Sequence, residues 1–208
     1  MYRLYGFPTQ NSNKVHYVLH ELNVPYEYQN VDLRKGEQKT PDFTKKNPIG
    51  KVPVLQHDNE YLFESGAICR YVANVENSAL YPTDKLKRGK VDQWMDFFTC
   101  HLGRWLSTLF FEIVFKSKAG MGQADQKTCD DARKFVEDQA NKVDQWLAGN
   151  RYLIGNELTI ADVFAFAYVE QVIPLQISLD AYPNLKRWFE ELGSRSAIQK
   201  AQEQFRAE

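Results

Sequence analysis

Residues 47–68, Asn47-Pro48-Ile49-Gly50-Lys51-Val52-Pro53-Val54-Leu55-Gln56-His57-Asp58-Asn59-Glu60-Tyr61-Leu62-Phe63-Glu64-Ser65-Gly66-Ala67-Ile68, decide the fold that this sequence predicts. The first part is typical of a loop that enters a strand, with Pro53 at the strand's start because proline cannot donate to a sheet. Residues 58–60 are a turn signal, and residues 61–63 form a short apolar run. Glu64-Ser65 stands where a helix begins. The predicted order is strand, hairpin, strand, helix.

The residues before this stretch alternate between strand and helix patterns. Residues 2–5 predict a strand, and residues 26–31 alternate as a second strand. Between them, one helical face is marked by Val15, Val18, Leu19 and Leu22. Strand, helix and strand in this order favour a parallel pair with a right-handed crossover. Residues 1–77 are therefore predicted to form a thioredoxin-like domain of βαβ-ββα order.

The rest of the chain has helical patterns only. Residues 78–87 predict a linker that leads into a charged helix start, and residues 88–208 predict an all-helical bundle domain. One helical face runs from Val91 to Leu109, and the run from Ile160 to Val172 is apolar nearly all round, which predicts a buried central helix. Thr159 and Asp162 are spaced as a capping box at its start. The expected fold class is α/β plus all-α.

The composition excludes several classes of function. The net charge of −1 gives no reason to expect nucleic acid or an anionic membrane surface as a partner. No apolar run reaches the ~18 residues that a membrane helix needs, and no signal-peptide pattern is present. The cysteines are few and widely spaced, so neither a disulfide framework nor a metal site is predicted, and a cytoplasmic, reducing setting fits best.

Motifs in both halves of the chain resemble the soluble glutathione transferases of the phi- and theta-like or bacterial type. They are residues 47–55, Glu64-Ser65, the box at residues 159–162 and the helix entry at residues 182–188. The resemblance covers nearly the whole chain. It implies an enzyme of detoxification that conjugates glutathione, as co-substrate, to small hydrophobic electrophiles without a further cofactor. It also implies a homodimer.

The resemblance assigns glutathione to the first domain. The family's proline matching Pro53 is cis, although only about 5–6% of X-Pro bonds are, and the backbone of Val52 would pair with the ligand as a strand does. Glu64 would bind the α-amino group, and Ser65 with the helix N-terminus would bind a carboxylate. Taken alone, Ser65 favours a helix cap, which is compatible with an anion site. A second carboxylate of glutathione would be bound by Gln38, Lys39 and Lys51. Without the resemblance, these residues equally indicate a solvated basic loop.

The loop after the first strand should activate the thiol, whose free pKa is near 8.5. Phi, theta and many bacterial members place a serine six residues before the apolar residue that Val15 matches, and Thr9 stands there. Asn11 matches an asparagine of some bacterial disulfide-reductase-like members. Ser12 is an alternative activator that equally suggests a helix N-cap, and activation without a side chain also stays open. No cysteine lies in residues 7–15, which argues against members that form a mixed disulfide.

The electrophile would lie between the loop at Phe7 and the first long helix of the second domain. The candidates on that helix are His101, Trp105 and Phe111, although aromatic residues at helical spacing more often belong to a core. His101 has no partner at metal-ligand spacing. Two other functions stay open: a glutathione-dependent disulfide or peroxide reductase, which Thr9 with Asn11 favours, and a non-catalytic binding module with the same fold.

Overall fold

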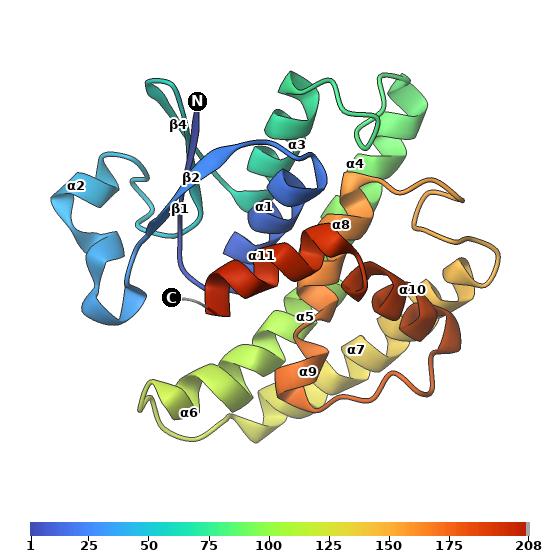
Figure 1. Ribbon diagram of the computed structural model, residues 1–208. Helices are drawn as coiled ribbons and strands as arrows, with labels where there is room; N and C mark the ends of the chain where they lie inside the picture. Colours follow the sequence, from blue (N-terminus) through green and yellow to red (C-terminus); the bar gives the residue numbers. More distant parts are fainter. Residues whose placement is uncertain (207–208) are drawn as a thin grey trace. The chain divides into compact units, whose positions relative to one another are not determined.

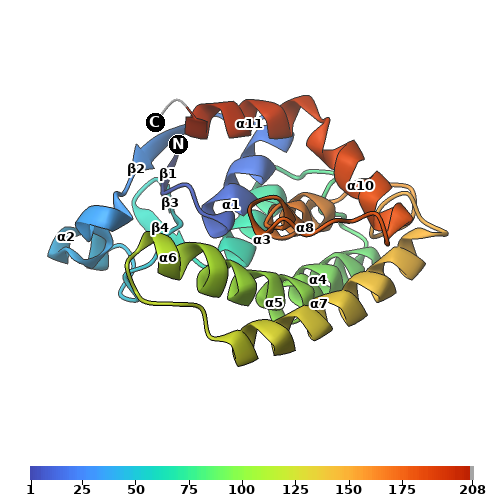
Figure 2. The same cartoon turned by 90° about the horizontal axis from the view of Figure 1, so that it is seen from below.

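A computed structural model describes the backbone of residues 1–206 and the side chains of residues 1–204. The chain forms two compact units, Met1–Tyr81 with the segment from Arg195 onward, and Pro82–Ser194. The last helix, α11 (Ser196–Arg206), groups with the first unit because it packs against α1 (Gln10–Glu21), as Figures 1 and 2 both show. Arg195 reinforces this packing, since its guanidinium donates to both carboxylate oxygens of Glu21 at 2.6 and 2.8 Å.

The first unit is built on a four-stranded sheet in the order β2-β1-β3-β4 (Figure 1). β1 (Tyr2–Gly6) is parallel to β2 (Tyr26–Asn30) and antiparallel to β3 (Val54–His57), which forms a hairpin with β4 (Glu60–Phe63). α1 connects the parallel strands, and α3 (Ser65–Val75) follows the hairpin. The predicted βαβ-ββα, thioredoxin-like order is therefore confirmed.

Each face of the sheet has its own core, because successive side chains point to opposite faces. On one face, Tyr5 and Val54 pack with Val31 and with Phe43 of the short helix α2 (Pro41–Thr44). The paired Leu4 and Leu55 point to the other face, where α1 and α3 contact each other, and both are fully buried. Two 3-10 turns, η1 (Leu33–Lys35) and η2 (Glu37–Lys39), lead from β2 to α2.

The second unit is helical. Its elements are α4 (Lys85–Cys100), α5 (Leu102–Leu109), the π-helical η3 (Phe110–Phe115), α6 (Lys116–Lys118), α7 (Gln126–Leu147), α8 (Ile160–Val169), α9 (Val172–Leu175) and α10 (Pro183–Gly193). All ten residues of α8 are buried, so the predicted central helix is confirmed, although it ends at Val169. None of the described helices is both long and apolar enough to cross a membrane.

The helical face predicted from Val91 to Leu109 is divided between two helices. His101 has φ −121° and ψ −102°, which interrupts the helix between α4 and α5. Gly103 follows at a point of close approach to α8: a Cβ there would lie 2.3 Å from the Phe98 carbonyl oxygen and 2.4 Å from the Tyr168 ring. Only glycine allows this packing.

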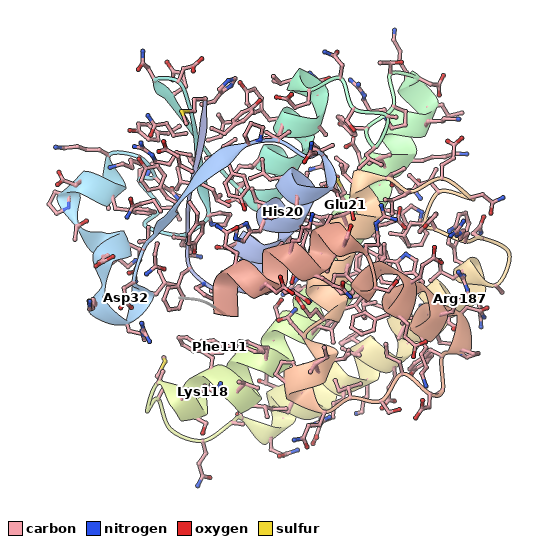
Figure 3. All side chains as sticks on the ribbon, viewed as in Figure 1. His20, Glu21, Asp32, Phe111, Lys118 and Arg187 are labelled. Atoms are coloured by element: carbon pink, nitrogen blue, oxygen red, sulfur yellow. The ribbon has the colours of Figure 1, made fainter. Side chains whose placement is uncertain are left out.

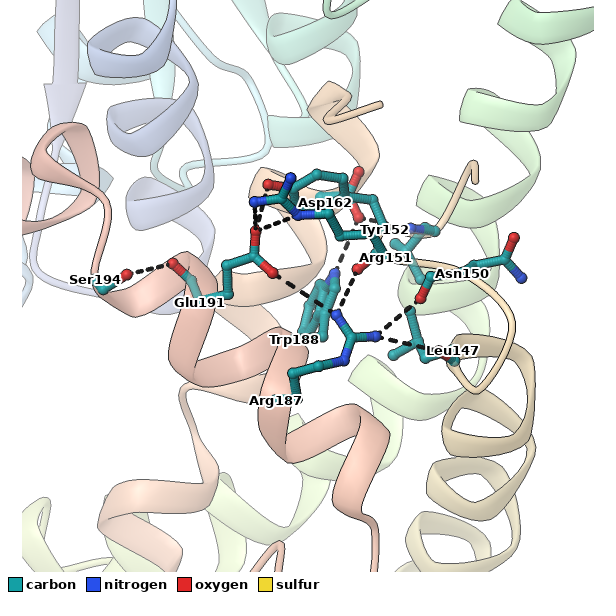
Figure 4. A network of polar contacts seen from close by, with 10 residues as sticks. Leu147, Asn150, Arg151, Tyr152, Asp162, Arg187, Trp188, Glu191 and Ser194 are labelled. Atoms are coloured by element: carbon teal, nitrogen blue, oxygen red, sulfur yellow. Dashed lines mark hydrogen bonds and ion pairs between the residues drawn. The ribbon is translucent and has the colours of Figure 1, made fainter. Parts of the chain in front are cut away.

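A buried carboxylate organises the start of α8 (Figure 4). Asp162 accepts hydrogen bonds from the amide of Leu153 at 2.8 Å, from the indole nitrogen of Trp188 at 3.0 Å, and from the amide and hydroxyl of Thr159, both at 3.0 Å. Burial raises the pKa of Asp162, and these hydrogen bonds oppose that rise. The capping box predicted at Thr159 and Asp162 is present.

Candidate functional site

The sheet register gathers most of the predicted site residues at one end of the sheet. Tyr5, near the end of β1, is opposite Val54, the first residue of β3, and Val54 is opposite Phe63, the last residue of β4. The turn after β1, the loop before β3 and the helix start after β4 therefore leave the sheet side by side.

The turn after β1 holds the three predicted activators. Thr9 is the N-cap of α1, and its Oγ1 accepts from the Ser12 amide and donates to Ser12 Oγ, both at 3.4 Å. Both contacts are long, since O–H···O hydrogen bonds cluster near 2.7–2.8 Å. The half-buried Thr9 hydroxyl can therefore turn its proton toward a stronger acceptor. Ser12 is fully buried, and its Oγ also accepts from the Phe7 amide at 3.3 Å, so it braces the turn.

The loop before β3 is fixed by Asn47. The side chain of this buried residue donates to the Lys51 carbonyl at 2.7 Å and accepts from the Ile49 amide at 3.0 Å. The peptide bond between Val52 and Pro53 is cis. Among the described residues, neither the amide nor the carbonyl of Val52 has a hydrogen-bond partner. These two groups are therefore open to an extended ligand that pairs as a strand does.

Gln38 and Lys39 lie against this same loop. Gly50 has φ +63°, and a Cβ there would be 3.0 Å from the Gln38 carbonyl oxygen and 3.4 Å from the Lys39 side chain. The side-chain oxygen of Gln38 is buried without a hydrogen-bond partner among the described residues. Such an atom is an exception that calls for a partner. Lys39, whose side chain approaches Gly50, and Lys51, which follows Gly50 in the chain, are both exposed cations.

The start of α3 forms the third part of the site. Glu64 has φ 70° and ψ 110°, an unusual backbone conformation for a residue with a side chain, and such strain is often kept at ligand clamps. Ser65 is 9% exposed and begins the helix. Because the Ile68 amide is bonded to the Glu64 carbonyl at 2.9 Å, the amides before it face out of the helix end. With the helix dipole, they form a site for an anion.

Lys14, on α1, interacts with residues of these segments, and the sequence reasoning missed it. Its side chain is fully buried, and Nζ donates to Asn11 Oδ1 at 2.6 Å. Burial lowers the pKa of Lys14 well below its usual value, while the Cys69 thiol and the Glu64 carboxylate act in the opposite direction. One signal was present in the sequence: Lys14 precedes Val18 by one helical turn and so falls on the apolar face of α1.

The four predicted electrophile-site residues belong to different units. Phe7, in the first unit, is half-buried with the Arg34 guanidinium 5.5 Å from its ring centre. In the second unit, His101 is exposed, and Trp105 stacks on Phe135 with ring centres 4.4 Å apart. Phe111 is 41% exposed at the start of the π-helical turn (Figure 3). An electrophile site that uses all four stays a prediction.

Comparisons with known proteins agree with the fold. Residues 1–74 match the family model of the glutathione S-transferase N-terminal domain, and residues 104–196 match that of the C-terminal domain. The chain is 34% identical to glutathione S-transferase 3 of Zea mays, over 95% of this chain and 91% of the maize protein.

Two solved structures show the same similarity. Glutathione transferase F2 from Populus trichocarpa is 28% identical with a TM-score of 0.93 over 100% of both chains. A glutathione S-transferase-I bound with lactoylglutathione is 29% identical with a TM-score of 0.88, over 96% of this chain and 97% of that one. The chain therefore belongs to the glutathione S-transferase family, with plant F enzymes among its relatives.

Proposed function

We propose that this protein binds glutathione at the end of its sheet and transfers it to small hydrophobic electrophiles, with Thr9 as the residue that activates the thiol. The observation that carries this proposal is the amide and carbonyl of Val52, which have no hydrogen-bond partner within the described part of the chain and lie between a weakly held hydroxyl and a helix N-terminus. Glutathione is an extended tripeptide that offers a backbone pair for Val52, a thiol for the hydroxyl and a carboxylate for the helix N-terminus, and its second carboxylate would meet the Lys39 and Lys51 cations.

The ligand would be held along its whole length. The cysteinyl backbone pairs with the amide and carbonyl of Val52, which Pro53 follows at the entry to β3. The γ-glutamyl carboxylate takes the Ser65 hydroxyl and the free amides of α3, while Glu64 accepts from the α-amino group. The glycyl carboxylate meets the cations of Lys39 and Lys51 and the side-chain amide of Gln38, whose nitrogen donates.

Thr9 would supply the chemistry by stabilising the thiolate. Its hydroxyl exchanges the 3.4 Å contact with Ser12 for a charge-assisted hydrogen bond to sulfur. The N-terminus of α1 favours the same negative charge. The thiolate then attacks an electrophilic carbon: a carbon–sulfur bond forms, and the leaving group departs with its electron pair. Holding the two reactants in position supplies much of the remaining rate enhancement.

The second substrate would be held by aromatic and apolar surface. Phe7 would contribute from the first unit, and His101, Trp105 and Phe111 from the second. The exposure of His101 and Phe111 supports this assignment. Trp105 is half-buried against Phe135, so it would present one edge of its ring.

A second candidate function is the reduction of mixed disulfides or hydroperoxides with glutathione. Asn11 favours it, because this half-buried residue lies in the first turn of α1 beside Thr9 and offers a second polar group to sulfur. The same thiolate would then attack sulfur or peroxide oxygen instead of carbon, the S–S or O–O bond would break, and a thiolate or an alkoxide would leave with its electron pair.

The assembly and setting follow from the family and from the cysteines. We infer a homodimer, which analytical ultracentrifugation tests directly. We also infer a cytoplasmic location, because Cys69, Cys100 and Cys129 are all free thiols, as a reducing compartment would keep them. Neither nucleic acid nor a membrane is an expected partner.

The experiment is a comparison of substrates with the wild type and Thr9→Ala. Glutathione turnover is measured with an aryl halide, an activated alkene, a mixed disulfide and a hydroperoxide. Conjugation of the carbon electrophiles, lost in Thr9→Ala, supports the transferase. Turnover of the disulfide or peroxide alone would replace it with the reductase, and binding without any turnover would leave a binding module.

A further inference from the structure

We propose that Lys14 is a positioning residue that orients Asn11, so that the Asn11 side-chain amide donates a second hydrogen bond to the glutathione thiolate. The inference rests on the proposed function, because it assigns a further donor to the same thiol. Lys14 itself would touch neither substrate, since its side chain is fully enclosed by the protein.

The contact between Lys14 and Asn11 fixes which end of the amide faces outward. Lys14 Nζ donates to Asn11 Oδ1 at 2.6 Å, so the amide atom that faces the amine is the oxygen. The nitrogen of the same amide therefore points away from the buried amine. Among the described residues, Asn11 Nδ2 has no hydrogen-bond partner, and the side chain is half-buried in the first turn of α1. The end of the amide that points away from Lys14 is thus a hydrogen-bond donor, and a thiolate can accept from it.

Lys14 is also linked to α3, through its backbone carbonyl and through the charge of Glu64. The Cys69 thiol, on α3, donates to the Lys14 carbonyl at 3.6 Å and so pins α1 to α3. The carboxylate of Glu64, at the start of α3, is close enough to favour the charged form of Lys14. Lys14 therefore interacts with α3, whose start would bind the γ-glutamyl end, while its amine holds Asn11.

Neither the Cys69 thiol nor the Lys14 amine competes with the glutathione thiol as a nucleophile. Burial raises the pKa of the Cys69 thiol to about 12, so it stays protonated and is no nucleophile. Burial lowers the pKa of Lys14 well below its usual value and so favours the neutral amine, but the fully enclosed side chain cannot reach a substrate. Both forms of the amine carry hydrogens, so Lys14 can still donate to Asn11 Oδ1 after it loses its proton.

The test is a double-mutant cycle on Lys14 and Asn11, read out by the pKa of the bound glutathione thiol from thiolate absorbance. Lys14→Met keeps most of the buried stem and removes the donor. It is expected to raise the thiol pKa by about one unit, a tenfold loss of thiolate preference, and Asn11→Ala by a similar amount. The double variant should show no further rise, because both changes remove the same hydrogen bond.

Cys69→Ala is the matched control, since it alters packing beside Lys14 and leaves the amine and Asn11 in place. It should lower stability without moving the thiol pKa. If Lys14→Met does not fold, Lys14→Gln replaces it. The glutamine nitrogen is one bond closer to the backbone than the lysine nitrogen, so it lies farther from Asn11, and the same rise in the thiol pKa is expected.

The outcomes separate this inference from the proposed function. If Lys14→Met raised the pKa of the bound thiol as much in the Asn11→Ala variant as in the wild type, Lys14 would not act through Asn11. No rise with Lys14→Met or with Asn11→Ala would equally overturn the inference, while a lowered thiol pKa in the wild type would leave the transferase intact. No thiolate signal in the wild type would overturn both.

Discussion

The carboxylate of Asp162 accepts a hydrogen bond from the indole nitrogen of Trp188 at 3.0 Å, and both side chains are fully buried. The bond joins the first turn of α8 to α10, while the other oxygen of the carboxylate holds the Thr159 cap. One buried charge thus satisfies four donors from three segments of the helical unit. Its cost of burial is offset only while all of these donors remain in place.

Asp162→Ala should therefore lower the free energy of unfolding by about 3 kcal/mol or more, because it leaves buried donors on Trp188 and Leu153 without an acceptor. Urea denaturation of both proteins measures the difference. Asp180→Asn is the matched control: Asp180 is an exposed carboxylate bonded to Lys186 and Ser178, and its loss should change stability by about 0.5 kcal/mol or less. Equal effects of the two substitutions would contradict the role given to Asp162.

Thr9→Ala should lower kcat with an aryl halide by about 100-fold, because one donor to a developing anion contributes on that scale. Thr9→Ser keeps the hydroxyl and should retain most of the activity. Ser12→Ala should act mainly on stability, since Ser12 Oγ accepts from the Phe7 amide within the turn. Steady-state kinetics and thermal unfolding of the three variants separate these effects. A larger loss of kcat in Ser12→Ala than in Thr9→Ala would reverse the assignment.

Ser65→Ala should raise the KM for glutathione about tenfold, because a hydrogen bond to a carboxylate contributes roughly 1.5 kcal/mol to ligand binding. The kcat should change little, since this contact lies away from the thiol and is made equally in the ground and transition states. Initial rates at varied glutathione concentration measure both constants. Ser78→Ala is the control, because Ser78 lies beyond α3 and its hydroxyl accepts from the Leu80 amide at 3.1 Å, away from the proposed site. A change in kcat without a change in KM would argue against the anion site at α3.

Stability should fall in acid because of His16. This histidine is fully buried beside Tyr26 and Tyr28, and burial lowers its pKa to about 3, with His20 adding to the effect. The folded chain therefore keeps His16 neutral below pH 6.5, where the unfolded chain takes up a proton. The free energy of unfolding should fall as the pH drops from about 6.5 toward 3, by at most ~1.4 kcal/mol per pH unit for this group.

The variant His16→Phe cannot take up this proton in either state. Urea unfolding between pH 7 and pH 4 should give a shallower acid slope for His16→Phe than for the wild type, whatever their difference at pH 7. His20, whose pKa burial also lowers, would account for part of the slope that remains. Identical slopes in the two proteins would show that His16 is not the group responsible.

Local patterns were sufficient to predict the sheet and the caps. The hairpin, the helix start at Ser65 and the box at Thr159 each depend on a few neighbouring residues, and the structure contains all three. The cis peptide bond before Pro53 came from the resemblance alone, because the Val52-Pro53 dipeptide by itself favours trans.

Features that depend on distant contacts could not be predicted. The interruption of the helix at His101 goes with the close approach of Gly103 to Tyr168, which a helical periodicity does not reveal. The packing of α11 depends on Arg195 meeting Glu21, far away in the sequence. Lys14 escaped notice because a lysine is expected on a solvated face, and only the fold shows that its amine is enclosed.

The central claim is that this chain binds glutathione and holds its sulfur as a thiolate. Titration of glutathione into the protein across pH, followed by the ultraviolet absorbance of the thiolate, measures both properties in one experiment. We expect saturable binding and a bound thiol that ionises well below its free pKa of about 8.5. Binding with an unshifted thiol pKa would contradict activation by Thr9, and no binding at all would contradict the site formed by Val52, Glu64 and Ser65.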